Sequence, residues 1–594
     1  MNQNQHTPNW ALETLVPEEV YTDRQTFLDY FYKTALRART RRTFSTVLLG
    51  QRRMGKTEIF KRVVNRLFFE QDHQDAEAVI PVYYSFPDTF KDRWDFATKY
   101  VENFMRWTVA FRLRETKFLS QDAVTSQELI ETIRQNESLF SERFQGTLKL
   151  LNGFFDKAVI IPEEVAVCLP RRIASYDNIT IVVFLDEFQN TRLPQYDFDV
   201  VGYMQEAVES PTCPHFVTGS AMSILAREIL GRGSLFGRFD SDPIEPLTGY
   251  WGTELTRNAA NYYQADISEE MAPIVAERCG GNPFYITAVA RQANKLNQVI
   301  ADEESLNTIL AVNLSSGFIW AELNDQVSRW IERINEYGIT KWILYLSALE
   351  EGDRIDLERI QQTLIKQEGQ HLSLDKIRNV LIKLSRGDLV QYMELGGWFR
   401  KVKDPILLEF LKVWGRIEVE GQDESFVRDN LQIKYNRLKR QISELKGYMA
   451  EVYMAQILLN AQRQNLPGKY FHQPNDIAVP SFNFMILRER LGTGKGAEID
   501  VHGGAGIEQW VAESKWYQGR KVGIAEAKKL LDKGEMVRQN RDADFARTWF
   551  FGNDGFTREA EDFMRENEIF WSTRADLDEL LSYVQLRRLP TFSQ

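Results

Sequence analysis

The sequence predicts an α/β protein of several domains, with a parallel sheet in its N-terminal half. Two largely apolar runs, residues 46–49 and 179–185, lack the alternation of half-exposed strands, so we expect both to be buried on each face of that sheet. Helical periodicity follows the first run, and a β-rich run at residues 78–85 supplies another strand. The 594 residues are enough for roughly three to five domains of ordinary size.

A glycine loop follows the first apolar run and opens a helix. Its residues are Gly50, Gln51, Arg52, Arg53, Met54, Gly55, Lys56 and Thr57. The two glycines allow the backbone to wrap a triphosphate with its N–H groups pointing inward. Lys56 is expected to reach the β- and γ-phosphates, and the Thr57 hydroxyl is expected to hold Mg²⁺. We therefore interpret the loop as a site for ATP and Mg²⁺, with a plain glycine turn before an ordinary helix as the alternative.

The second apolar run ends in two carboxylates, Asp186 and Glu187. This is the position of a Walker B motif, in which Asp186 would bind the water shell of Mg²⁺ and Glu187 would polarise the attacking water. Strands often end in charged residues, so the motif depends on the glycine loop that precedes it in the sequence. Between the two motifs, residues from about 90 to 175 are expected to form a helical insertion over the sheet.

Two weaker features follow. A third strand at residues 215–218 ends in small polar residues, and Thr218 or Ser220 could sense the γ-phosphate there, with a simple strand-end turn as the alternative. The glycine-rich loop at 231–239 carries Arg232 and Arg238. We choose Arg238 as an arginine finger that would act on a neighbouring subunit, the alternative being a plain surface arginine.

These segments, together with a helix break at Gly280-Gly281-Asn282-Pro283, resemble the archaeal-type ATPases of the STAND branch of AAA+ P-loop NTPases. The resemblance covers about residues 20 to 300 and continues more weakly beyond them. It implies an ATP-driven switch, often oligomeric, in which a helical lid closes on the nucleotide. The expected domains are an ATPase core with a helical insertion at 1–249 and a lid at 250–337.

Residues 338–429 are expected to form a winged-helix domain with linker helices. Three amphipathic segments at 339–349, 357–366 and 374–384 precede two short strands. A winged helix suggests DNA binding. The third helix offers only a few basic residues amid acids, so a packing role that relays lid movement is the alternative.

The C-terminal region, residues 430–594, contains the second chemical constellation. It combines Glu451 on a helix, Asp500 at a strand end, and Glu513 and Lys515 on the next strand. Glu513 and Lys515 share a face because alternate strand residues point the same way. Converging carboxylates can hold one or two Mg²⁺ ions, and a neighbouring lysine can position or deprotonate a water, which is what phosphodiester hydrolysis needs.

The order of Glu451, Asp500, Glu513 and Lys515 resembles the PD-(D/E)xK nuclease fold, and residues 551–581 look like the tail of Mrr-like restriction endonucleases. The resemblance implies a restriction-endonuclease-like α/β domain in which Asp500 and Glu513 hold the metal and Glu451 is an auxiliary acid. Ile499 stands where the family has a proline.

Charge is distributed unevenly along the chain. The formal net charge of −11 argues against a protein that coats nucleic acid or membrane through bulk charge. Residues 431–594 nevertheless contain 24 Lys and Arg against 22 Asp and Glu, a balance of +2 that leaves −13 on the rest. The C-terminal region is thus the part best suited to approach phosphates. A polar and basic stretch after the Glu513 strand could line a DNA backbone track, with solvated surface side chains as the alternative: Gln518, Arg520, Lys521, Lys528, Lys529 and Lys533.

The sequence thus favours a nucleotide-controlled, metal-dependent DNA endonuclease, and the two resemblances imply defence against foreign DNA. A regulatory or scaffold ATPase whose C-terminal domain binds nucleic acid or protein without cleavage is the alternative. An ATP-driven translocase would need motor motifs that we do not find. Scattered cysteines, a polar N-terminus and the absence of a long apolar run predict a cytoplasmic protein without a membrane partner. We expect a homo-oligomer that responds to a trigger, possible triggers including a protein.

Overall fold

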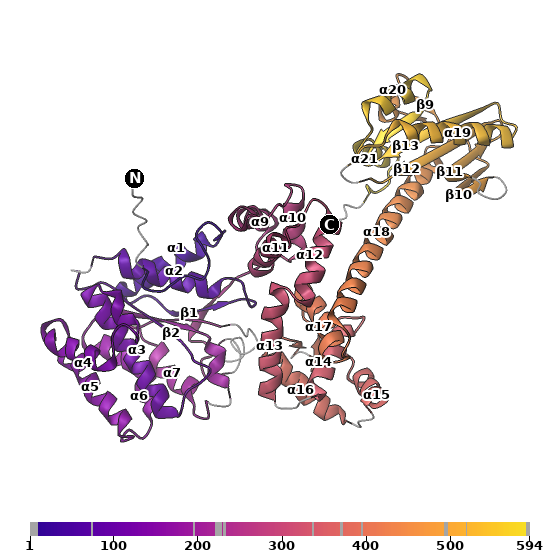
Figure 1. The fold of residues 1–594 in the computed structure, drawn as a ribbon. Coiled ribbons are helices and arrows are strands. Elements are labelled where there is room, and N and C mark those ends of the chain that lie inside the picture. Colours follow the sequence, from indigo (N-terminus) through magenta and orange to yellow (C-terminus); the bar gives the residue numbers. More distant parts are fainter. Residues whose placement is uncertain are drawn as a thin grey trace. The chain divides into compact units, whose positions relative to one another are not determined.

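The structure is a computed structural model that describes residues 10–72, 75–193, 196–219, 229, 233–334, 338–368, 372–393, 396–491, 497–517 and 520–589. The chain forms two compact units, Met1–Gln432 and Ile433–Gln594 (Figure 1). Among the described residues, no helix is both long enough and apolar enough to cross a lipid bilayer.

The first unit is built around a parallel sheet. Its described strands are β1 (Ser45–Leu49), β2 (Ile80–Ser85), β3 (Ile181–Asp186), β4 (His215–Thr218) and β5 (Phe239–Pro243). They lie in the order β2-β3-β4-β1-β5, and every pair is parallel. β1 and β3 are buried along their whole length, as expected from continuous apolar runs. The predicted parallel sheet is therefore confirmed, and the glycine loop between β1 and a helix gives it the form of a P-loop ATPase fold.

Helices surround this sheet: α1 (Gln25–Arg37), α2 (Lys56–Phe69), α3 (Arg93–Leu113), α4 (Ser126–Gln135), α5 (Glu142–Phe155), α6 (Pro162–Tyr176) and α7 (Val200–Val208). α3 to α6 form the expected helical insertion, and α3 packs against β2, α5 and α6. Aromatic side chains join the layers, since Phe60 of α2 meets Phe184 of β3 edge to face at 5.3 Å. Buried side chains of α3 to α6 belong to the same hydrophobic core as those of the strands, so the insertion completes the core over the sheet.

A helical segment follows the sheet: α9 (Gly249–Tyr263), α10 (Met271–Arg278), α11 (Pro283–Leu296), α12 (Glu303–Ser315) and α13 (Phe318–Ile334). The expected helix break lies between α10 and α11. Asn282 caps α11, and Pro283 occupies its first turn. Gly281 has a φ of +64°, and a Cβ there would lie 2.3 Å from the Leu247 carbonyl oxygen, so the turn requires glycine.

The last part of the first unit contains the elements expected for a winged helix. They are α14 (Ile339–Leu349), α15 (Leu357–Glu368), α16 (Leu374–Arg386), the antiparallel pair β6 (Gln391–Met393) and β7 (Trp398–Arg400), and α17 (Pro405–Glu418). Helix α13 packs against α11 and α12 and also against α14, α16 and α17. It is therefore shared between the two helical segments.

The second unit contains a mixed sheet in the order β10-β11-β12-β13-β14. Its elements are the C-terminal part of α18 (Glu424–Asn460), β8 (Asn465–Leu466), β9 (Ile477–Ala478), β10 (Phe484–Leu491), β11 (Ala497–Ala505), β12 (Glu508–Lys515), α19 (Ile524–Asn540), β13 (Phe545–Gly552), α20 (Arg558–Glu566), β14 (Phe570–Thr573) and α21 (Arg574–Tyr583). The first two strand pairs are antiparallel, and the last two are parallel. One core contains side chains of α18 and α21, and the other contains side chains of α19 and α20.

Candidate functional site

The glycine loop has the backbone that a phosphate site requires. A Cβ at Gly50 would lie 2.1 Å from Cγ2 of Ile244, so only glycine fits where the loop passes the end of β5. Gly55 has a φ of +88° and directly precedes α2, while Arg53 has a φ of +68°, which is unusual for a residue with a side chain. Strained backbone of this kind is concentrated at functional sites.

Lys56 is buried and bonded to its own loop. Its Nζ donates to the carbonyl oxygens of Gly50 and Gln51, both at 2.7 Å. Burial lowers the pKa of Lys56 to about 8, although the Asp186 carboxylate partly opposes this shift. The ammonium group is therefore held by two weak acceptors, and phosphate oxygens would be stronger ones.

Thr57 and Asp186 lie together, as expected for the two residues that would hold Mg²⁺. The Thr57 hydroxyl hydrogen-bonds the Asp186 carboxylate, and the Tyr83 hydroxyl donates to Asp186 Oδ2 at 2.9 Å. Burial, followed by the charge of Glu187, raises the pKa of Asp186. A buried carboxylate beside a hydroxyl suits a hard divalent cation, so these residues fit Mg²⁺.

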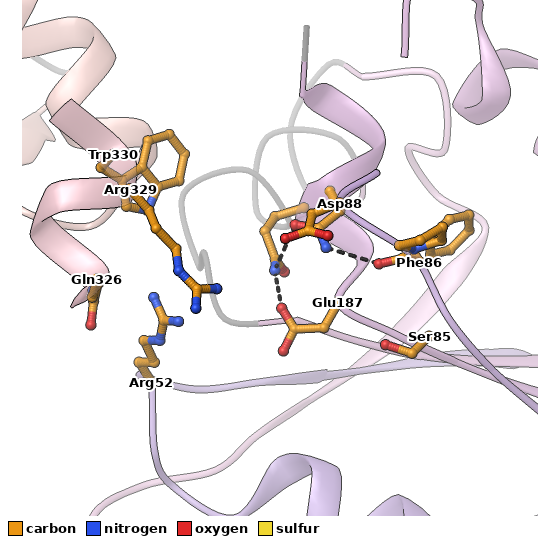
Figure 2. Close-up of a pocket in the computed structure, with 11 residues that line it drawn as sticks. Arg52, Ser85, Phe86, Asp88, Glu187, Gln326, Arg329 and Trp330 are labelled. Atoms are coloured by element: carbon orange, nitrogen blue, oxygen red, sulfur yellow. Dashed lines mark hydrogen bonds between the residues drawn. The ribbon is translucent and has the colours of Figure 1, made fainter. Parts of the chain in front are cut away.

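Glu187 has a strained backbone and borders a cavity of about 320 Å³. Its φ is +51°, and Gln189 donates a hydrogen bond to its carboxylate (Figure 2). The cavity is lined by P-loop, strand-end and α13 residues: Arg52, Ser85, Phe86, Pro87, Asp88, Glu187, Gln189, Asn190, Gln326, Arg329 and Trp330. The expected general base thus borders an open space beside the P-loop.

Arg329 of α13 is a residue that the sequence did not single out. Figure 2 shows its guanidinium near that of Arg52, with Glu187 across the cavity. Burial lowers the pKa of Arg52; the Glu187 carboxylate opposes that shift, and the charge of Arg329 adds to it. Two neighbouring cations at a cavity favour the binding of an anion there. No local pattern could have revealed Arg329, because it lies in the middle of a helix far along the chain.

Arg53 also connects the P-loop to the helices that follow the sheet. It forms an ion pair with Glu322 of α13, and its guanidinium lies 4.9 Å from the ring centroid of Phe284 on α11. Burial lowers the pKa of Arg53 to about 10. The middle positions of the P-loop therefore bind protein side chains from two helices.

The expected nucleotide sensors are placed differently. Thr218 is fully buried, and its hydroxyl donates to the Leu48 carbonyl oxygen at 3.1 Å, so it ties β4 to β1. Arg238 is held within its own chain, with its Nε 2.7 Å from Glu209 Oε1. Ser220 and Arg232 lie outside the described residues. The sensor role of Thr218 and the finger role of Arg238 stay predictions, and each requires the side chain to exchange its present partner.

The second unit brings Asp500, Glu513 and Lys515 together at adjacent strands. Val501 and Ala512 form the last pair between β11 and β12, and Asp500 and Glu513 lie next to that pair on their strands. The Ser514 N–H donates to Asp500 Oδ2 at 2.8 Å. Ile499 and Val501 nevertheless pack in different cores, so the alternation of faces breaks at Asp500. The Glu513 charge acts on the Asp500 carboxylate, so the two acids lie close together.

Burial and neighbouring charges shift the pKa values of Asp500 and Lys515 in this cluster. Burial, then Glu513 and more weakly Glu451, raise the pKa of Asp500 to about 6, while Lys515 and the Ser514 N–H oppose that shift. For Lys515, burial acts to lower the pKa, but the Glu513 and Asp500 carboxylates outweigh it and raise the pKa. The structure therefore brings Asp500, Glu513 and Lys515 within electrostatic range of one another, and their catalytic roles stay predictions.

Two basic residues join this cluster. Glu513 Oε1 accepts from Lys515 Nζ at 2.7 Å, and Oε2 accepts from Lys533 Nζ at 2.5 Å. Glu451 accepts two hydrogen bonds from Arg488, at 2.7 and 3.0 Å. Lys533 was expected only on a DNA track, and Arg488 was not singled out. Both reach the site through tertiary packing, which sequence spacing does not show.

The acidic cluster fits Mg²⁺ better than a cation that needs many protein ligands. Within the part of the chain that the structure describes, no group of three or more His, Cys, Asp or Glu side chains is arranged to hold a metal ion. Mg²⁺ keeps several waters and often takes only one or two carboxylates together with substrate phosphates. Asp500 and Glu513 can supply that pair.

Comparison with known proteins gives only distant similarity. No protein-family model matches the chain, and no curated protein matches it. A Walker-type ATPase of Pyrococcus abyssi is 14% identical, with a TM-score of 0.41, and the match covers 68% of this chain and 99% of that one. The Aeropyrum pernix ORC2 protein in its ADPNP and ADP complexes is also 14% identical, with a TM-score of 0.38 and coverage of 72% and 98%. The Aeropyrum pernix ORC1 protein in complex with DNA is 13% identical, with a TM-score of 0.36 and coverage of 70% and 97%. At these TM-scores the similarity assigns no function to this chain.

Proposed function

We propose that the chain is an ATP-binding and ATP-hydrolysing switch that controls a metal-dependent DNA endonuclease acting in defence against foreign DNA. The observation that carries the proposal is the meeting of Asp500, Glu513 and Lys515 at the ends of adjacent strands. The phosphate loop lies in the first unit and the nuclease-like cluster in the second. Nucleotide-dependent control and DNA cleavage would therefore belong to different units. We further propose that the protein is a cytoplasmic homo-oligomer that acts on DNA after a trigger, such as a protein.

In the first unit, Lys56 would leave its loop carbonyls and bind the β- and γ-phosphates of ATP. Mg²⁺, when bound, neutralises charge on the phosphate oxygens. Thr57 and Asp186 would hold it, and Glu187 would orient the attacking water. Arg238 would stabilise the transferring phosphoryl group from a neighbouring subunit.

In the second unit, Asp500 and Glu513 would hold Mg²⁺, and Lys515 would position or deprotonate the attacking water. Glu451 would act as an auxiliary acid. Mg²⁺, when bound, polarises the phosphodiester and its attacking water. The local positive balance of residues 431–594 favours approach of a nucleic-acid backbone over an uncharged substrate.

Plasmid cleavage tests the nuclease half. The wild-type chain with Mg²⁺ should cut plasmid DNA, whereas Glu513→Gln and Lys515→Ala should each lose cleavage by roughly 100-fold or more. The matched control is Glu498→Gln, because Glu498 lies on the same strand as Asp500 but is paired with Arg490 on the exposed surface. If the wild type never cuts, with or without ATP, the endonuclease proposal is wrong.

ATP hydrolysis tests the other half. Lys56→Ala removes the cation that would hold the phosphates, so hydrolysis should fall to background while the protein stays folded. Continued hydrolysis by this variant would remove the P-loop assignment. Plasmid cleavage and ATP hydrolysis are measured with different substrates. The nuclease proposal and the ATPase proposal can therefore be refuted independently.

A second function is favoured by one observation. Cations hold both carboxylate oxygens of Glu513 and both of Glu451, which would suit a domain that binds without cutting. The chain would then be a regulatory or scaffold ATPase whose C-terminal domain binds nucleic acid or protein. DNA binding by the full chain without cleavage under any nucleotide condition would support this second function.

A further inference from the structure

We propose that Lys533 and Arg488 are positioning residues that occupy the acidic cluster until DNA draws them away, so that a divalent cation and DNA bind cooperatively. The inference rests on the proposed nuclease function and adds the order in which its site is assembled. Neither residue is assigned to cleavage itself. Each would exchange a carboxylate partner for a phosphate of the DNA backbone.

Both carboxylate oxygens of Glu513 already accept a hydrogen bond from an ammonium group, so a metal ion would have to compete with these cations. Lys515 bonds one oxygen at 2.7 Å, and Lys533 bonds the other at 2.5 Å. The Glu513 side chain is only 9% exposed, whereas that of Lys533 is 19% exposed. The carboxylate is therefore fixed in the site, and the lysine reaches it from α19, whose outer side meets solvent.

Glu451 is occupied in the same way. Arg488 donates to both of its oxygens, and the guanidinium also lies 4.7 Å from the ring centroid of Tyr448. The Glu451 side chain is 6% exposed, but that of Arg488 is 44% exposed. A bidentate pair of this kind is stable, yet its arginine has room to turn toward a ligand in solvent.

The charges of the cluster balance. Three carboxylates face three cations among the described side chains: Asp500, Glu513 and Glu451 against Lys515, Lys533 and Arg488. A divalent cation that entered this half-buried site alone would have to compete with Lys533 for Glu513 and would leave excess positive charge. DNA supplies phosphates that can take over Lys533 and Arg488, because guanidinium and ammonium groups bind phosphate well.

It follows that metal ion and DNA should each raise the affinity for the other by the same factor. We expect that factor to be about tenfold, within the usual range of coupling between two sites. Lys533 carries most of it, because it bonds directly to the proposed metal ligand Glu513. Arg488 contributes through Glu451, so its share is smaller.

The test is calorimetric titration of Ca²⁺ into the nucleotide-free full chain, alone and with a short DNA duplex. Ca²⁺ binds oxygen ligands as Mg²⁺ does, and a gel after each titration checks that the duplex is intact. The wild type should bind Ca²⁺ about tenfold more tightly with DNA than without it. A Glu513→Gln titration, run in parallel, identifies the heat that belongs to this cluster.

Lys533→Gln should bind Ca²⁺ about fivefold more tightly than the wild type in the absence of DNA, and most of the gain from DNA should disappear. Loss of a purely structural lysine would instead weaken Ca²⁺ binding. Lys533→Arg keeps the charge and should restore the wild-type coupling. The matched control is Arg538→Gln, which removes a positive charge from the same helix but from an ion pair with Glu535 on the surface.

The outcomes separate this inference from the proposed function. If the wild type cuts DNA but Lys533→Gln and Arg538→Gln bind Ca²⁺ equally, the inference is wrong and the nuclease proposal stands. If the wild type cuts DNA with Mg²⁺ but the cluster binds no Ca²⁺ with or without DNA, the inference is wrong and the nuclease proposal stands. If the wild type neither cuts DNA nor binds Ca²⁺ at the cluster, the proposed function fails. Should Lys533→Gln fail to fold, Arg488→Gln must still raise DNA-free Ca²⁺ affinity, and an unchanged affinity there overturns the inference.

Discussion

Raising the pH from about 7.5 to about 9 should weaken nucleotide binding roughly tenfold, because Lys56 must carry a proton to hold phosphate. In the nucleotide-free chain its pKa is about 8, since burial and two carbonyl partners stabilise its charge poorly. At about pH 9, roughly nine tenths of the free molecules would have lost this proton. Bound phosphate returns the pKa toward the ordinary value of 10.5, so the tenfold loss corresponds to about 1.4 kcal/mol.

The assay is calorimetric binding of ADP in EDTA, so that no metal ion contributes. Measurements in two buffers of different ionisation enthalpy should show uptake of nearly one proton per ADP at about pH 9 and little uptake at about pH 7.5. Lys56→Arg keeps its proton throughout this range, so any binding it retains should be independent of pH. A wild-type affinity that stays constant across this range would refute the reasoning.

The contribution of Lys56 to protein stability changes with pH in the opposite direction to its contribution to nucleotide binding. The folded-state pKa of Lys56 lies below its unfolded value, so the unfolded chain binds more protons between about pH 8 and 10.5. The contribution of Lys56 to the stability of the nucleotide-free protein therefore rises with pH in that window. Its ability to bind phosphate falls in the same window.

Three further results are expected. Gly50→Ala should lower the unfolding free energy by about 1–3 kcal/mol in thermal unfolding, whereas Gly146→Ala, at an open position inside α5, should leave it unchanged or raise it by up to about 1 kcal/mol. Glu322→Gln removes an ion pair with the P-loop and should change the ATP dependence of DNA cleavage more than the rate of cleavage without nucleotide. If Arg238 acts between subunits, Arg238→Ala and Lys56→Ala should each lack ATP hydrolysis alone and should regain part of it when mixed; no recovery would indicate that Arg238 acts within its own chain or not at all.

The sequence predicted those parts of the fold that local chemistry determines. Continuous apolar runs located β1 and β3, and the glycine loop located the start of α2. β5 was not predicted, because Phe239–Pro243 contains two aspartates and lies half exposed at the sheet edge, where pairing with β1 determines its conformation. Local patterns specify buried strands well and edge strands poorly.

The same distinction holds for the candidate sites. Residues within one motif, such as Lys56 and Thr57 or Glu513 and Lys515, were identified because their spacing fixes their geometry. Arg329 could not be identified from the sequence, because only the packing of α13 against the core brings it to the cavity. The Thr218 hydroxyl bonds the neighbouring strand, which its position at a strand end could not reveal, and its sensor role stays a prediction.

Helix α13 offers a physical route from the nucleotide to the rest of the first unit. Its Glu322 pairs with Arg53 of the P-loop, and its Arg329 faces the cavity that Glu187 borders. On the same helix, the Trp330 ring packs so closely on Gly387 that a Cβ there would lie 2.7 Å from it, and Gly387 belongs to the turn after α16. A bound phosphate that attracted Arg53 or Arg329 would therefore change the contacts of α13. This helix already packs against the turn after α16, which belongs to the expected winged helix. Since packed interfaces of this kind have few alternative arrangements, such a change would tend to move α13 and α16 together.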